Sequence, residues 1–170
     1  MPGLDQEIFE YIKDATGNST VFPLRRNVRN TPNIVQWLKQ ICKARIEETE
    51  SAGSGPEVRS VKPSAFSKVV SGAEVDSQLG AIEKNKLVHL YLDKNADEYS
   101  SVATKAGVPS HTIESFKGLE SPFVVITGLG SVNSVSEFQQ IAYKAVSRAR
   151  YLALIVDEGN IVDLKLKAVD

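Results

Sequence analysis

Apolar residues along the chain follow two alternating patterns. Short, nearly continuous apolar runs predict strands that are covered on both faces; these runs are 21–24, 87–92, 122–127 and 151–156. Between them, apolar residues recur every three or four positions, which predicts helices that pack by one face; these segments are 5–16, 31–48, 73–85, 95–106 and 134–147. Weaker strand signals lie at 58–61, 110–114 and 161–167.

Several of the predicted helices also carry terminal signals. Thr31 followed by Pro32 is typical of an N-cap and a first helical position. Ser134 followed by Glu137 fits a capping box, and Gly107 is placed to end the helix at 95–106. Because strands alternate with helices, we predict an α/β three-layer sandwich: a mainly parallel sheet with helices on both faces.

The 170 residues fit one domain, 1–170. Within it, 51–72 is expected to be a loop or the remnant of an insertion, because 51–56 is rich in Ser and Gly, and 157–170 a C-terminal extension. The net charge of −1 offers no chain-wide footprint for nucleic acid, so any DNA contact must be local.

Cysteine and histidine usage argues against disulfide and metal sites. The single cysteine, Cys42, lies in a helical apolar pattern and is expected to be a buried hydrophobe. His89 and His111 lack partners at zinc-ligand spacing, so we predict no metal site and assign both to structure. With no long apolar stretch and no signal-like start, a soluble, reducing, cytoplasmic setting without membrane contact is expected.

Three arginines, Arg25, Arg26 and Arg29, follow the predicted strand at 21–24. Guanidinium groups present a fork of donors that suits phosphate oxygens. Ligands of open parallel sheets bind at the carboxyl ends of strands, so this loop and those after 110–114 and 122–127 are the places expected to carry a site. The alternative interpretation of the arginines is a solvated basic turn.

Two further segments carry candidate chemistry. Lys117-Gly118 permits a tight turn whose N–H groups hold an anion, and Glu120 can accept hydrogen bonds from ribose hydroxyls. The alternative is a corner in which Gly118 only supplies a positive φ. Arg148, at the end of the 134–147 helix, fits an arginine finger that stabilises a transferring phosphoryl group. Alternatively, it only offsets the negative end of the helix dipole.

In their order and spacing, Asn27-Val28-Arg29, Thr112 to Glu120 and Ala145-Val146-Ser147-Arg148-Ala149 resemble one family. They are similar to motifs in the second, C-terminal RecA-like motor domain of a UvrD/Rep-type superfamily 1 DNA helicase. The resemblance implies that Arg29 contacts the γ-phosphate of ATP and that Arg148 is the finger. It also implies that Glu120 binds ribose beside Lys117 and Gly118.

The chain departs from the family pattern at two positions. Val28 replaces a tyrosine, which removes ring packing near the nucleotide or DNA. Glu114 replaces a histidine that faces DNA in the family, and an acid there repels phosphate. The resemblance nevertheless implies that Thr112, Glu114 and Ser115 form the DNA-facing loop.

The resemblance implies a shared site for ATP with Mg²⁺, completed by an N-terminal RecA-like ATPase domain of the same protein. It also implies contact with single-stranded DNA through the assembled helicase. The sequence has no Gly-x-x-x-x-Gly-Lys-Ser/Thr loop to cradle the triphosphate, and the resemblance assigns no residue of this chain to magnesium. The chain alone is therefore expected not to hydrolyse ATP. A catalytically silent RecA-like interaction module is the second hypothesis, and an unrelated α/β enzyme is the third.

Overall fold

The computed structural model describes residues 30–45, 55, 58–72, 82–92 and 97–159. Within these residues, five strands form one sheet in the order β1-β5-β4-β2-β3, and every neighbouring pair is parallel. The strands are β1 (Arg59–Val61), β2 (Leu87–Tyr91), β3 (Ser110–Thr112), β4 (Ser121–Thr127) and β5 (Ala149–Val156).

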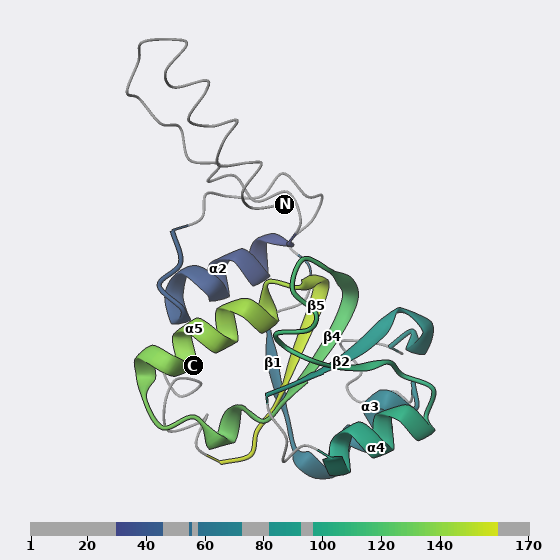
Figure 1. The fold of residues 1–170 in the computed structure, drawn as a ribbon. Coiled ribbons are helices and arrows are strands. Elements are labelled where there is room, and N and C mark those ends of the chain that lie inside the picture. The colour runs from purple at the N-terminus through teal and green to yellow at the C-terminus, as the bar shows by residue number, and fades with distance from the viewer. Residues whose placement is uncertain (1–29, 46–54, 56–57, 73–81, 93–96, 160–170) are drawn as a thin grey trace, which may run out of the picture.

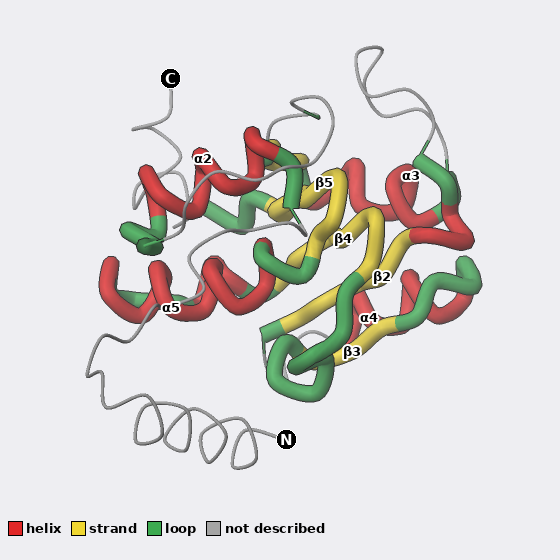
Figure 2. Tube along the Cα trace, turned by 90° about the horizontal axis from the view of Figure 1, so that it is seen from above, coloured by secondary structure: helices red, strands yellow, loops and turns green. Residues whose placement is uncertain are grey.

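Helices cover both faces of this sheet. The helices α2 (Pro32–Ile41) and α5 (Val135–Val146) lie on one face, while α3 (Phe66–Val70) and α4 (Asp97–Lys105) lie on the other (Figures 1 and 2). Short 3₁₀ turns are η1 (Pro63–Ala65), η2 (Lys84–Lys86) and η3 (Leu129–Ser131). The predicted three-layer α/β sandwich is therefore confirmed.

The continuous apolar runs belong to strands whose side chains enter two hydrophobic cores, one on each face of the sheet. Along β4, Val124 and Ile126 join the core beneath α2 and α5, whereas Val125 joins the core beneath α3 and α4. Alternate side chains of a strand point to opposite faces, so a strand covered on both faces needs apolar residues at consecutive positions. This requirement explains why β2, β4 and β5 could be predicted from the sequence.

Helix α2 is shorter than its sequence pattern predicts. It begins at Pro32 with Thr31 as N-cap, as expected, but it ends at Ile41 rather than near residue 48. Lys43 adopts a left-handed conformation with φ of 58°, and the Ala44 N–H returns to the Leu38 carbonyl at 3.1 Å. A left-handed residue cannot continue a right-handed helix, so the chain leaves the helical path there.

The segment 51–72, expected to be a loop or a remnant insertion, contains regular structure in its second half. Strand β1 pairs with β5, and Phe66, Val69 and Val70 of α3 are buried in the core of that face. Strand β3 ends at Thr112 rather than at residue 114. The elements predicted at 5–16, 21–24 and 161–167, and most of the helix predicted at 73–85, lie outside the described residues.

No helix of the described part is long and apolar enough to cross a membrane.

Candidate functional site

Glu120 and Arg148 lie at the same edge of the sheet, each directly before one of two neighbouring strands. Glu120 directly precedes β4, Arg148 directly precedes β5, and the Ser121 N–H donates to the Arg148 carbonyl at 3.0 Å. Because all strands are parallel, this is the edge where the strands begin. The expectation that the site lies after the carboxyl ends of the strands is therefore wrong for Glu120 and Arg148. The loop after β4, one of the expected places, lies at the opposite edge.

Arg148 itself is partly buried and held by the end of α5. Its N–H donates to the Ala145 carbonyl at 3.1 Å, and its Nε donates to the Lys144 carbonyl at 3.2 Å. The Nε contact places the guanidinium at the negative end of the helix, as the helix-dipole interpretation predicts. A partly exposed side chain on a fixed backbone is also compatible with contact to an external phosphate.

Arg25, Arg26 and Arg29 precede the described residues, but the chain directly after them is anchored at this edge. Asn30 is 1% exposed, and its side-chain amide donates to the Ser147 carbonyl at 3.0 Å and to the Ala149 carbonyl. These two carbonyls flank Arg148. The residue that follows Arg29 in the sequence is therefore joined by direct hydrogen bonds to the motif segment that contains Arg148.

The third motif segment crosses one face of the sheet. It leaves β3 at the carboxyl edge and reaches β4 at the opposite edge, and on the way Ile113 and Phe116 are buried in the core beneath α2 and α5. Gly118 has a φ of +85°. The conformation that this position requires is one that glycine adopts at no steric cost, as both interpretations of the turn expected.

The backbone donors of this turn are largely used within it. The Lys117 N–H donates to the Glu114 carbonyl at 3.2 Å, and the Leu119 N–H donates to the Phe116 carbonyl at 3.0 Å. These two N–H groups therefore do not form the outward-facing anion nest expected around Gly118. Any anion contact by this turn must come from other groups, such as the exposed side chain of Lys117.

The polar side chains at the end of β3 satisfy one another. The Ser115 N–H donates to Thr112 Oγ1, and Ser115 Oγ donates to the Thr112 carbonyl, both at 3.0 Å. Glu114 Oε1 lies 2.8 Å from Lys144 Nζ on α5. The hydrogen bond from Lys144, and then its charge, lower the pKa of the Glu114 carboxyl. Glu114 is thus ionised, and the positive charge of Lys144 offsets its negative charge.

Glu120 has a similar partner. Its Oε1 lies 3.5 Å from Arg150 Nε, on the stretch of β5 where the register with β4 shifts. Ser121 pairs with Ala149 and Phe123 pairs with Leu152, so β5 carries one extra residue in between. Such bulges re-aim side chains and are common beside functional sites.

Two titratable groups outside this edge have shifted pKa values: His89, which is buried, and Cys42, which is partly buried rather than buried as predicted. His89 is fully buried, and its two ring nitrogens each lie 2.7 Å from a hydroxyl oxygen, Ser110 Oγ and Thr127 Oγ1. Burial lowers the pKa of His89 to about 4 and raises the pKa of the Cys42 thiol to about 12. Both groups are neutral at pH 7. No cluster of three metal-ligating side chains occurs among the described residues.

Asp157 and Glu158, directly after β5, form an acidic pair that the sequence argument did not weigh. Asp157 Oδ1 accepts the Gly159 N–H at 2.9 Å, and Glu158 Oε1 accepts the Gly128 N–H. These hydrogen bonds stabilise the loops that follow β4 and β5 at the carboxyl edge. Asn30 was also missed, because its partners lie more than a hundred residues away and leave no local signal.

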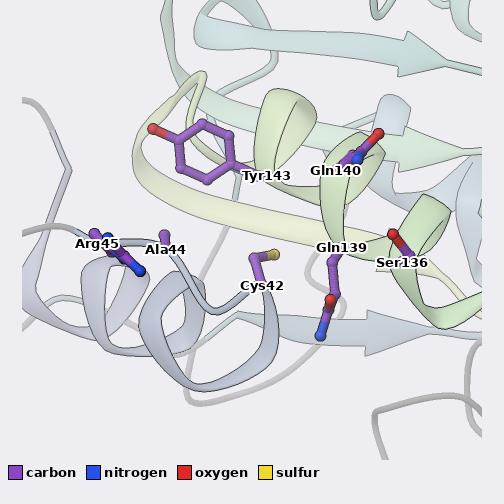
Figure 3. Close-up of a pocket in the computed structure, with 7 residues that line it drawn as sticks. All are labelled: Cys42, Ala44, Arg45, Ser136, Gln139, Gln140 and Tyr143. Atoms are coloured by element: carbon purple, nitrogen blue, oxygen red, sulfur yellow. The ribbon is translucent and has the colours of Figure 1, made fainter.

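A hollow of about 320 Å³ lies between the end of α2 and the outer face of α5 (Figure 3). It is lined by Cys42, Ala44, Arg45, Ser136, Gln139, Gln140 and Tyr143. Gln139 also donates to the Ile41 carbonyl at 3.1 Å, which ties the two helices together. None of the predicted site residues lines this hollow.

No protein-family model matches the chain, and no curated protein matches it. Among solved structures, it is similar to the C-terminal domain of a possible DNA helicase from Lactobacillus plantarum WCFS1. That similarity has a TM-score of 0.53 and 17% sequence identity, and it covers 76% of this chain and 86% of that one. The likeness confirms the predicted RecA-like α/β fold, the fold of a helicase C-terminal domain.

Proposed function

We propose that the chain is the second motor domain of an ATP-dependent DNA helicase or translocase of the UvrD/Rep type. In this proposal it supplies Arg29, Arg148 and Glu120 to an ATP and Mg²⁺ site that a Walker-bearing N-terminal RecA-like domain completes. Closure of the two domains on ATP then moves the protein along single-stranded DNA. The Lys117-Gly118 turn and the loop of Thr112, Glu114 and Ser115 are proposed to face nucleotide and DNA.

The observation that carries the proposal is that Asn30, Arg148 and Glu120, each within or next to a motif segment, lie at one edge of the sheet. The Asn30 amide bonds to the carbonyls beside Arg148, and the Ser121 N–H bonds to the Arg148 carbonyl, one residue from Glu120. A phosphate-binding arginine and a ribose-binding carboxylate must lie within reach of one nucleotide. An arrangement that brings together Glu120, Arg148 and the residue that follows Arg29 supports a shared ligand better than an isolated basic turn does.

The chain can be tested directly by titrating the ¹⁵N-labelled protein with Mg·ATP and following backbone amide and arginine Nε–Hε signals. A half-site of a few charge-assisted contacts should bind with a Kd of about 1 mM, which corresponds to about −4 kcal/mol. Shifts should concentrate at Asn30, Glu120, Ser121 and Arg148.

Arg148→Ala should weaken this binding at least about tenfold, because a hydrogen bond to a charged group is worth about 1.5–3 kcal/mol. Arg45→Ala is the matched control, since it removes an exposed arginine that lies beyond the C-terminal end of α2. In a protein that joins the chain to a Walker-bearing domain, Arg148→Ala should also remove most DNA-stimulated ATP hydrolysis. Equal ATP affinity of Arg148→Ala and the unmodified chain would contradict the finger assignment.

A catalytically silent interaction module is the second candidate. The observation that favours it is the hollow beside α5, bordered by the exposed side chain of Tyr143, together with the neutralised Glu114 (Figure 3). Under this proposal, partner binding ignores ATP and tolerates Arg148→Ala but is lost in Tyr143→Ala. The two variants therefore separate the candidates.

A further inference from the structure

Strand β5 carries one residue more than β4 between their first two paired positions. Pro122 of β4 therefore lies opposite two residues of β5, Arg150 and Tyr151. Proline has no N–H to donate to a ladder, so inside a sheet it is found at bulges rather than in regular pairing. Because β4 lies between β5 and β2, a bulge is the arrangement that such a proline allows.

The bulge directs Arg150 towards Glu120. A bulge turns side chains away from the directions that a regular ladder gives them. The Nε atom of Arg150 lies 3.5 Å from Oε1 of Glu120, and the two side chains are 59% and 38% exposed. The ring of Tyr151 instead lies edge-on to that of Phe123, with 5.8 Å between centroids. The ion pair is therefore open to solvent, while the next residue anchors the bulge.

The Glu120 carboxylate is the group whose orientation this pair affects. Glu120 directly precedes β4 and follows the turn at Gly118. A glutamate side chain has several rotatable bonds, so its carboxylate samples many positions unless a partner restrains it. A guanidinium group is planar and matches the geometry of a carboxylate, so Arg150 is suited to that restraint.

We propose that Arg150 is a positioning residue, which holds the Glu120 carboxylate in the orientation that accepts hydrogen bonds from the ribose hydroxyls of a bound nucleotide. This inference rests on the proposed function, which assigns ribose binding to Glu120. It gives Arg150 a role in recognising ribose without contact to the ribose itself. An arginine that only attracted phosphate would strengthen the binding of every nucleotide of equal charge alike, so the test compares two such nucleotides.

Mg·ATP and Mg·2′,3′-dideoxy-ATP have the same charge and base and differ only in the ribose hydroxyls. Each is titrated into the ¹⁵N-labelled chain, and the ratio of the two Kd values measures hydroxyl recognition. The unmodified chain should bind ATP at least about tenfold more tightly, because the dideoxy compound lacks a hydrogen bond to a charged group. Arg150→Ala should lower this ratio about threefold, an effect within the range of exposed ion pairs. Arg150→Lys keeps the charge and should give an intermediate ratio.

Lys86→Ala is the matched control. Lys86 is a basic residue at the same edge, and its Nζ atom lies 2.9 Å from Glu83 Oε2 in a similarly exposed ion pair. Its removal should weaken both nucleotides alike and leave the ratio unchanged. Glu120→Ala should abolish the preference for ATP, and adding Arg150→Ala to it should not change the ratio further. A positioning residue acts only through the residue that it positions, so the two effects must not add.

An unchanged ratio in Arg150→Ala would overturn the inference, as would an effect of Arg150→Ala on the ratio that persists in Glu120→Ala. The proposed function still stands in either case if Arg148→Ala weakens the binding of ATP. If the unmodified chain binds both nucleotides equally, the inference falls together with the ribose role of Glu120. If the unmodified chain does not bind ATP, the inference and the proposed function both fall. The midpoint of thermal unfolding verifies that each variant is folded during the titration.

Discussion

The buried histidine on β2 makes the stability of the chain depend on pH in a defined window. His89 bridges β3 and β4 through Ser110 and Thr127, and its ring also packs edge-on against Phe66 at 5.1 Å between centroids. Burial lowers its pKa from 6.5 to about 4. Between these two values the unfolded chain binds a proton that the folded chain does not, so stability must fall as the pH falls.

The size of the effect follows from the two pKa values. One unit corresponds to about 1.36 kcal/mol, so the full shift is worth about 3 kcal/mol and is reached only near pH 4. Between pH 7.5 and pH 5, where most carboxyl groups stay ionised, the loss should be about 2 kcal/mol. Above pH 7.5 the contribution of His89 should no longer change, because the imidazole is neutral in both states.

Urea unfolding followed by tryptophan fluorescence measures this slope. The chain has one tryptophan, Trp37, which is 4% exposed in the core beneath α2. His89→Gln should lower stability at pH 7.5, because Ser110 and Thr127 lose a partner, but it should flatten the dependence between pH 7.5 and pH 5. His111→Gln removes the other histidine and is the control. A slope that persists in His89→Gln, or vanishes in His111→Gln, would refute the assignment.

Three further predictions test the helix ends and the loop after β3. Lys43→Gly should stabilise the chain by about 0.5–1 kcal/mol in the same assay, because glycine adopts φ of 58° without steric cost. The control Lys39→Gly, inside α2, should destabilise the chain by about 1 kcal/mol. A loss of stability in both variants would contradict the left-handed conformation of Lys43. Ser134→Ala should cost about 1 kcal/mol, because Ser134 Oγ accepts the Glu137 N–H at 3.1 Å, and Ser134→Asp should retain the cap; equal stability of the two variants would count against it. Glu114→Gln should change stability by less than about 0.5 kcal/mol, because the Glu114 and Lys144 side chains are 72% and 51% exposed. The same variant should bind a fluorescein-labelled oligothymidylate more tightly at low salt, because a negative charge is removed. An unchanged affinity would mean that this loop does not contact DNA as proposed.

The sequence predicted those parts of the fold that depend on local pattern. Continuous apolar runs identified β2, β4 and β5, because both faces of each strand are buried. The capping box at Ser134 marked the start of α5, and Gly107, with φ of +82°, marked the end of α4. These features are encoded within a few residues of where they act.

Features that depend on tertiary contact could not be predicted in this way. Lysine is not a residue that marks a left-handed turn, so nothing at Lys43 predicted that α2 would end before it. The weak strand signal at 58–61 marked β1, but nothing in it indicated that β1 pairs with β5, about 95 residues later. The role of Asn30 depends on carbonyls 117 and 119 residues away.

The two edges of the sheet differ in the charge that they present, and this difference supports the proposed position of the nucleotide. At the carboxyl edge, Asp157 and Glu158 brace the loops after β4 and β5. At the opposite edge, the residues at the strand starts are mainly basic, namely Arg59, Lys86, Arg148 and Arg150. The described acids there, Glu83 and Glu120, pair with Lys86 and Arg150.

In the proposed function, this difference in charge favours a polyphosphate at the edge where Arg148 lies over the edge where ligands of single-domain parallel sheets usually bind. A domain that supplies only the arginine half of a site has no need of the phosphate loop that normally occupies the carboxyl edge. In the proposed function, that loop belongs to the other domain. The acidic pair can then brace the carboxyl edge without competing with the nucleotide.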